Sequence, residues 1–349
     1  MKKIALIAII ILIGIAGLGA LSYIQGWIPF FVSDEKIIST MIEKMGENKS
    51  WHSDLNIEME IKGIQGQEEE KVNVILNIEG DTDRADIENP KSAVNLDAEL
   101  KMEGMSFSLG GEIKILGKKD IYFRLTTIPA LPFLDILGLS LDELKNQWIK
   151  IDEEYLKESP DENEEMMKKL EELFKGKEFL KIEEKLPDKK INGINNYHYL
   201  ISLDKTELKK IIPEIVKISM ESNLGFKDLS ESEKEKTLEE TSNNINEFFD
   251  KIGDINFEVW VGKKDKLLYR LKTEKEIDIS KFYDEESLGQ ELRGNINIKL
   301  ELNLSDFNKE IRIEAPKEFK SINEVFPFIG TMGGQVLGEQ ILKEQILGK

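Results

Sequence analysis

The residues that could carry acid–base chemistry are two histidines, His52 and His198, and 67 Asp and Glu residues. Cysteine is absent, which excludes a thiolate nucleophile, a disulfide and a thiolate metal site. Two histidines are too few for a multi-histidine metal site. His198 lies on the polar phase of an alternating segment, between Tyr197 and Tyr199. We therefore expect both histidines at the surface or at a sheet edge, and we expect neither a metal nor a cofactor.

Carboxylate pairs such as Glu58 and Glu60 recur along the chain, and no single pair indicates a glycosidase-type site. The acidic stretch 80–88 lacks the residues that an EF-hand loop carries at its fifth and sixth positions, so we expect a solvated turn. The segment GTMGG at 330–334 has no following Lys-Ser or Lys-Thr and is not a P-loop. The apolar faces of the expected strands run without interruption, which argues against an enzyme.

The charge balance limits the class of partner. Lys and Arg number 48 against the 67 acids, which gives a formal net charge of −19. This charge would repel phosphates, so we expect no binding to nucleic acid. Hydrophobic residues make up 40% of the chain, enough for a large core.

The N-terminus is predicted to anchor the chain in a membrane. Residues 4–24 carry no charge and would span about 31 Å as a helix, close to the thickness of a bilayer core. Lys2 and Lys3 precede this segment, and Trp27, Phe30 and Phe31 follow it. The positive-inside rule then gives a single-pass protein of the cell membrane, with residues 1–3 in the cytoplasm and residues from about 25 onward outside. A cleaved signal peptide is the alternative.

After a linker at 25–32, the periodicity predicts an α+β domain over 33–320. Apolar residues from Ile37 to Met45 repeat at helical spacing, and Gly46 ends that helix. From residue 55 the period becomes two, which predicts half-buried antiparallel strands of about ten residues. Five such strands follow directly as a meander, with Glu103-Gly104 in one hairpin turn. Further strands are predicted at 147–152, 179–186, 197–203, 255–261, 267–279, 293–304 and 311–315.

The middle and the end of the domain differ from this pattern. Pro129 and Pro132 interrupt an apolar segment, 126–144, which either fills the core or forms a lid over an apolar cavity. Charged helices are predicted at 160–175, 205–221 and 230–252, with Ser230 as the cap of the last. The tail 321–349 could form a short helix. About eleven or twelve strands and four or five helices make one large curved antiparallel sheet with helices on one face.

The order of these features resembles the LolA-like and LppX-like lipoprotein carriers of bacterial envelopes. The resemblance covers most of 33–320 and depends on the first helix, the segment 49–53, the long strands, the apolar proline-containing segment, the segment 148–152 and the segment 311–316. It implies a half-barrel sheet that is closed by helices and holds acyl chains. Two features depart from it: the lipidated Cys of LppX-like proteins is absent, and the charged stretch around 222–252 has no obvious counterpart.

These observations predict a membrane-anchored, extracytoplasmic and non-catalytic protein of a bacterial envelope. Its partners would be the lipid bilayer, through residues 4–24, and a lipid or other apolar ligand in the half-barrel. Strand phase and the 126–144 segment give the expected lining: Leu76, Leu96, Leu100, Phe107, Leu109, Phe123, Phe133, Leu137, Phe257 and Leu300. The first alternative is a structural or protein-interaction module of the envelope with a filled core. An envelope hydrolase is the second, and the sequence identifies no protein partner.

Overall fold

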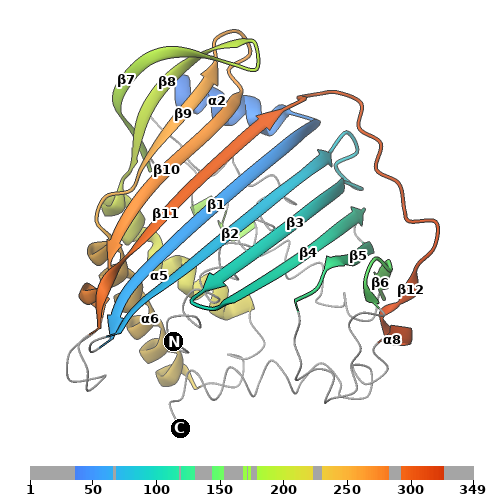
Figure 1. The fold of residues 1–349 in the computed structure, drawn as a ribbon. Coiled ribbons are helices and arrows are strands. Elements are labelled where there is room, and N and C mark those ends of the chain that lie inside the picture. Colours follow the sequence, from blue (N-terminus) through green and yellow to red (C-terminus); the bar gives the residue numbers. More distant parts are fainter. Residues whose placement is uncertain are drawn as a thin grey trace.

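Alternating apolar and polar residues form one open, twelve-stranded sheet in the computed structural model of the chain (Figure 1). The structure describes residues 36–65, 68–117, 119–129, 144–152, 168–170, 172–173, 179–222, 230–282 and 292–325. Across the sheet the strands lie in the order β12-β6-β5-β4-β3-β2-β1-β11-β10-β9-β8-β7. The α+β class predicted from the sequence is therefore confirmed.

The first five strands form the predicted meander. They are β1 (Ser50–Gln65), β2 (Glu68–Asp83), β3 (Lys91–Met102), β4 (Met105–Leu116) and β5 (Asp120–Thr127). The hairpin between β3 and β4 lies at the predicted position, and Gly104 takes a φ of 70°, which glycine adopts without steric cost. Strands β1 and β2 hold 16 residues each, so they are longer than predicted.

Two charged helices separate the two halves of the sheet in sequence. The hairpin of β7 (Leu180–Ile191) and β8 (Ile194–Leu203) leads into α5 (Lys205–Ser222), which continues through Pro213. Helix α6 (Glu231–Ile252) begins at the predicted cap, where Ser230 and Glu233 form a capping box. The two helices pack against each other. Most of the helix predicted at 160–175 lies outside the described residues.

The last long strands return to the middle of the sheet. They are β9 (Asn256–Gly262), β10 (Leu268–Asp278) and β11 (Leu292–Ser305), and the 3-10 helix η5 (Ile279–Phe282) follows β10. Strand β11 pairs with β1 along 14 positions, from His52 opposite Ser305 to Gln65 opposite Leu292. Asn308 fastens the end of this ladder: its side chain accepts from the Lys49 main chain at 2.9 Å and donates to Asn48 at 2.7 Å. The first and last long strands are thus neighbours.

Two sequence predictions need correction at the far edge of the sheet. The strand predicted at 147–152 is β6 (Ile149–Ile151), and its partner β12 (Lys320–Ser321) runs parallel to it, so the sheet is mixed rather than wholly antiparallel. Helix α8 (Ile322–Val325) follows β12. Residues 311–315 are not a strand, although Ile313 is buried and Lys114 Nζ donates to the Glu314 main-chain oxygen at 3.1 Å. An extended segment that buries every second side chain has the same periodicity as a paired strand.

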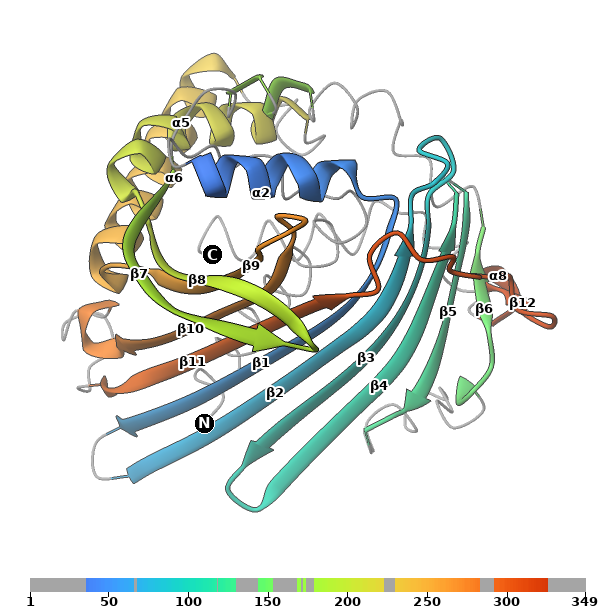
Figure 2. The ribbon, with the colours of Figure 1, turned by 90° about the horizontal axis from the view of Figure 1, so that it is seen from above.

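The sheet curves, and helix α2 (Lys36–Glu47) lies on its concave side (Figure 2). Helices α5 and α6 lie on the same side of the sheet. Helix α2 buries the apolar side that its sequence predicts, and this side packs on β8 to β11 and β1. Its buried residues are Ile38, Met41, Ile42 and Met45. We call this face of the sheet the concave face and the opposite one the outer face.

Among the described residues, which begin at Lys36, no helix is long and apolar enough to cross a membrane. The predicted anchor at 4–24, the predicted linker at 25–32 and the end of the tail lie outside the described residues. The anchor, the cytoplasmic stub at 1–3 and the boundaries of the domain remain predictions.

Candidate functional site: the concave face

The strand register gathers the predicted lining residues on one face of the sheet. Directly opposed residues of neighbouring antiparallel strands point to the same side. Leu300 opposes Ile57, Ile57 opposes Leu76, Leu76 opposes Ala98, and Ala98 opposes Leu109. We call such a line of opposed residues a row. This row runs across five strands, of which β11 lies far in sequence from the other four.

The neighbouring rows contain the other described lining residues. Leu100 lies between Val74 and Phe107, Leu96 lies opposite Ile78, and Phe123 lies opposite Ile113. Phe257 lies opposite Ile201, which packs in the cluster beneath α2. Eight of the ten predicted lining residues therefore share the concave face. Phe133 and Leu137, with most of the apolar segment 126–144, lie outside the described residues.

Packing on this face is uneven. One buried cluster lies beneath α2, and a second, built from Met59, Val74 and their neighbours, lies toward the other end of β1 and β11. Ile57 and Leu76 lie between the two clusters and are 3% and 2% exposed. The part of the face formed by β11, β1 and β2 is thus covered.

The same rows become exposed as they reach β4. Leu109 is 42% exposed and Ile113 is 37% exposed, although both point to the concave side. Met105, at the start of β4, is also exposed. Large apolar side chains in such positions leave an apolar surface on β4 within the curve of the sheet.

One charged residue interrupts these rows, and the sequence analysis missed it. The rows in question extend from that of Leu304 to that of Ile296. Among the described residues of β1 to β6 and β9 to β11 that face the concave side in these rows, Lys275 of β10 is the one charged side chain. It occupies the apolar phase of β10, between Leu271 and Ile277. The statement that the apolar faces run uninterrupted was therefore wrong. A lysine on the apolar phase of a strand was the signal in the sequence.

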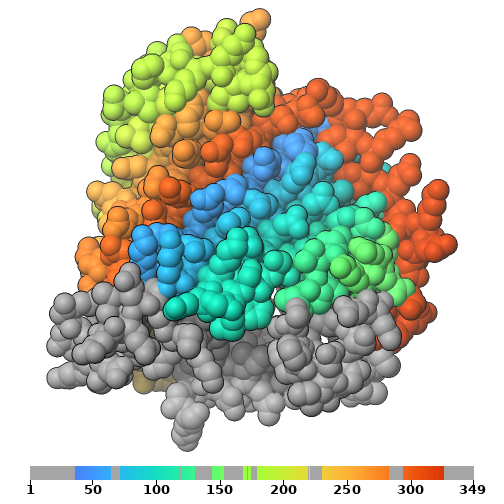
Figure 3. Space-filling view, in the orientation of Figure 1, coloured from blue at the N-terminus to red at the C-terminus, as the bar shows by residue number. Residues whose placement is uncertain are grey.

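The outer face is polar and carries a shallow depression of about 350 Å³. Figure 3 shows this face, formed by the strands from β7 to β5. The depression is lined mainly by outward side chains of β11, β1, β2 and β3, including Glu58, Glu60, Lys101 and Lys299. Glu60 accepts from Lys62 at 2.6 Å and from Lys71 at 2.5 Å, and these lysines lower the pKa of Glu60 to about 2. Ion pairs of this kind are typical of a solvated sheet face.

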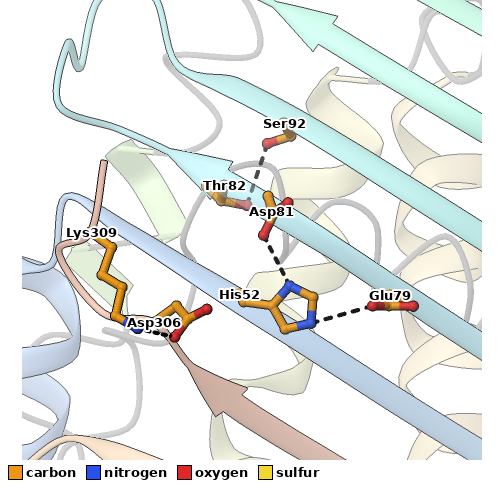
Figure 4. A network of polar contacts seen from close by, with 7 residues as sticks. All are labelled: His52, Glu79, Asp81, Thr82, Ser92, Asp306 and Lys309. Atoms are coloured by element: carbon orange, nitrogen blue, oxygen red, sulfur yellow. Dashed lines mark hydrogen bonds and ion pairs between the residues drawn. The ribbon is translucent and has the colours of Figure 1, made fainter. Parts of the chain in front are cut away.

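His52 lies on the outer face of β1, where both of its ring nitrogens face carboxylates (Figure 4). Nδ1 lies 2.9 Å from Asp81 and Nε2 lies 3.6 Å from Glu79. A serine hydrolase needs one ring nitrogen of its histidine directed at the nucleophile. The nearby hydroxyls of Thr82 and Ser92 contact each other instead, at 3.4 Å. This arrangement does not form a catalytic triad.

His198 is buried, which corrects the expectation of a surface position. It is 3% exposed, stacks on Trp260 with ring centroids 4.3 Å apart, and places Nε2 2.7 Å from Glu258. Its phase was predicted correctly, on the polar side of β8 opposite Trp260. A substrate could not reach a histidine that is so enclosed. Groups of three or more His, Asp or Glu that could hold a metal are absent from the part of the chain that the structure describes.

No protein-family model and no curated protein matches the sequence. Solved structures do match. The chain is similar in fold to two mycobacterial proteins, LppX and LprF. The lipoprotein LppX of Mycobacterium tuberculosis matches with 9% identity and a TM-score of 0.33, covering 81% of this chain and 100% of that one. LprF of Mycobacterium bovis matches with 12% identity and a TM-score of 0.33, covering 80% and 95%.

A DUF1329 family protein of Desulfovibrio piger matches with 8% identity and a TM-score of 0.19, covering 79% of this chain and 92% of that one. The sequence resembles the LolA-like and LppX-like carriers, and LppX is among the solved structures that match.

Proposed function

We propose that the chain is a non-catalytic lipid-binding protein of a bacterial envelope. The concave face would bind the acyl chains of a lipid, or another apolar ligand. Residues 4–24 would anchor the domain to the cell membrane, on the side away from the cytoplasm. A fixed anchor favours local capture or transfer of a lipid over transport across the envelope.

The exposed apolar surface on the concave side of β4 carries this proposal. Leu109 and Ile113 point into the curve of the sheet and are 42% and 37% exposed. Burial of apolar area contributes about 25 cal/mol per Å², so an acyl chain that covered these side chains would be stabilised. Sites for apolar ligands are concave and mostly apolar, as this surface is.

The covered part of the face supports the second candidate, a structural or protein-interaction module with a filled core. Ile57 and Leu76 are almost fully buried, so this part of the face offers no room to a ligand. The two candidates make different predictions for β4. A lipid-binding protein contacts lipid through Leu109 and Ile113, whereas a module with a filled core does not.

Photolabelling in cells tests the proposal on the full chain. Cells that make the protein are given a fatty acid with a diazirine in its chain and a terminal alkyne, and they are then irradiated. We expect mass spectrometry to find lipid adducts on inward-facing residues such as Leu100, Phe107 and Leu109. Adducts that are confined to residues 4–24, or spread equally over the outward residues Lys101, Ser106 and Ser108, would contradict lipid binding on the concave face.

A further inference from the structure

Two neighbouring hairpins carry a group of lysines at the end where they turn. One hairpin joins β7 to β8 and the other joins β9 to β10, and they are neighbours because β8 pairs with β9 (Figure 1). The Lys263 main chain donates to the Asn195 main-chain oxygen at 3.0 Å, which joins the two turns. We call the lysines of these turns the lysine cluster: Lys185, Lys189, Lys190, Lys263, Lys264 and Lys266.

The lysine cluster is a local excess of positive charge in an acidic chain. The hairpin ends, residues 185–196 and 261–268, hold the six lysines against two acids, Asp188 and Asp265. Their local charge is therefore +4, although that of the whole chain is −19. Exposed charges more than about 8–10 Å apart are largely screened at physiological salt. A partner at this end of the molecule thus meets the local charge.

Most of this positive charge is not neutralised within the described part of the chain. Asp188 pairs with Lys263 at 2.5 Å, and Asp265 accepts from the Tyr269 hydroxyl at 2.6 Å. The other five lysines of the cluster form no ion pair with a described residue. Four of these five are exposed: Lys185, Lys189, Lys190 and Lys264. Their ammonium groups are therefore accessible to an anionic surface.

An aromatic ring holds part of the cluster in place. Three ammonium groups lie 4.8 to 5.4 Å from the centre of the Tyr197 ring, those of Lys185, Lys263 and Lys266. The face of an aromatic ring attracts a cation electrostatically. These contacts offset part of the repulsion between the lysines, so the fold keeps them together at the two turns.

The lysine cluster lies at the same end of the molecule as α2, the first described helix (Figures 1 and 2). Ile194 of β8 packs in the buried cluster beneath α2, and the Leu268 main chain donates to Met45 Sδ at 3.4 Å. Lys36, the first residue of α2, follows the predicted membrane span 4–24 by about 12 residues, which can extend over at most about 43 Å. The predicted anchor would therefore keep α2, and this end of the domain with it, near the bilayer.

Helix α6 lies away from the hairpin turns and carries the opposite charge (Figure 1). It leads into the start of β9, whereas the turns lie at the end of that strand. Its sequence holds seven acids against three lysines. A bilayer with anionic head groups attracts exposed lysines and repels an acidic helix. The distribution of charge thus favours one orientation of the domain on an anionic membrane surface.

We propose that the lysine cluster docks on anionic lipid head groups of the membrane that anchors the chain. This inference rests on the proposed function, because it needs the anchor at 4–24. The anchor makes docking intramolecular, so a few weak contacts are enough to hold the domain against the bilayer. Docking turns the two hairpins toward the membrane and α6 away from it.

The test uses the full chain in vesicles and one fluorophore on an introduced cysteine, since the chain has no cysteine of its own. Asn195→Cys places the fluorophore at the lysine cluster. Ser106→Cys places it near the turn between β3 and β4, at the other end of the strands (Figure 1). Both positions are exposed. A phosphatidylcholine with a nitroxide on its head group quenches a fluorophore near the membrane surface, and vesicles with and without phosphatidylglycerol are compared.

We expect phosphatidylglycerol to increase quenching at Asn195→Cys and not at Ser106→Cys. Salt at about 1 M, where the Debye length is about 3 Å, should remove the increase. Replacement of the four exposed lysines of the cluster by glutamine should also remove it, because each lysine near an anionic surface contributes about fivefold. The matched control changes the net charge equally and should keep the increase; it replaces four exposed lysines elsewhere: Lys91, Lys145, Lys272 and Lys317.

Equal quenching at the two positions would overturn the inference, and so would an increase that survives the four substitutions in the lysine cluster. Quenching at Asn195→Cys that does not depend on phosphatidylglycerol would overturn it too, and would leave the cluster to an acidic protein partner. Flotation of the vesicles after a carbonate wash tests the anchor separately. A chain that leaves the vesicles lacks the proposed anchor, and the inference fails with it, whereas a retained chain without a lipid-dependent signal disproves the docking alone.

Discussion

Leu109 is the side chain on which the two interpretations of the concave face differ most. It belongs to an apolar row, yet it is 42% exposed, whereas Ile57 and Leu76 of the same row are buried. A lipid ligand would cover this side chain, whereas a module with a filled core leaves it without a lipid contact. Its neighbour Ser108 points to the outer face of the same strand and is also exposed.

This pair of residues gives a prediction at the scale of one side chain. We expect Leu109→Asp to lower lipid photolabelling of the concave face severalfold, because a carboxylate without a partner is costly beside an acyl chain. Ser108→Asp serves as the control and should label like the wild-type chain. Since both sites are exposed, neither change should unfold the domain. Equal labelling of the two variants would argue that lipid does not contact β4.

For His198, the sequence predicted the face of the strand on which the side chain lies, but it did not predict that the side chain is buried. Periodicity reports which face a side chain occupies and does not report what covers that face. Trp260 lies on the same polar face of β9 and stacks on His198, and Lys189 from β7 lies 5.7 Å from the centre of the Trp260 ring. A tryptophan on the polar phase of a strand was the available signal. Lys275 gave the opposite signal, because it is a cation at an apolar position of its strand.

At the scale of the elements, the start of α6 was predictable because capping depends on local sequence. Ser230 and Glu233 are three residues apart, and the Ser230 main chain donates to the Glu233 carboxylate at 2.9 Å. The pairing of β1 with β11 was not predictable, because alternation specifies a face and no partner. The same limit explains the false strand at 311–315.

The capping box gives a prediction for this element. We expect Ser230→Ala to destabilise the first turn of α6 by about 1 kcal/mol. Ser232→Ala, at an exposed position in the same turn, should have little effect. Hydrogen exchange of the amides in this turn measures the difference. Similar exchange rates in the two variants would mean that packing, and not the cap, holds the start of α6.

At the scale of the whole molecule, the excess of acids makes stability depend on pH. Lys62 and Lys71 lower the pKa of Glu60 to about 2, and Lys181 lowers that of Asp204. Native carboxylates with lowered pKa values bind fewer protons than they do in the unfolded chain. Their stabilising effect is complete above the unfolded pKa, near 4.5 for Glu60, and is lost as the pH falls toward about 2.

We therefore expect the urea midpoint of the full chain in mild detergent to fall when the pH is lowered from about 7 to about 3. Tryptophan fluorescence follows the transition, because Trp51 and Trp260 are buried. Glu60→Gln should reduce the size of this change. A midpoint that is constant over this range would show that these ion pairs contribute nothing to the stability of the sheet.

The pairing of β1 with β11 has a consequence for how the chain reaches its folded state. His52 and Ser305 are partners although they lie 253 residues apart in sequence. Synthesis at about 5–20 residues per second delays the second partner by roughly 13 to 50 s. During this time one edge of β1 has hydrogen-bonding groups without partners, a known cause of aggregation. The nascent chain is therefore most vulnerable through the strand that later lies in the middle of the sheet, and a chaperone that protects this edge would act before residue 292 is made.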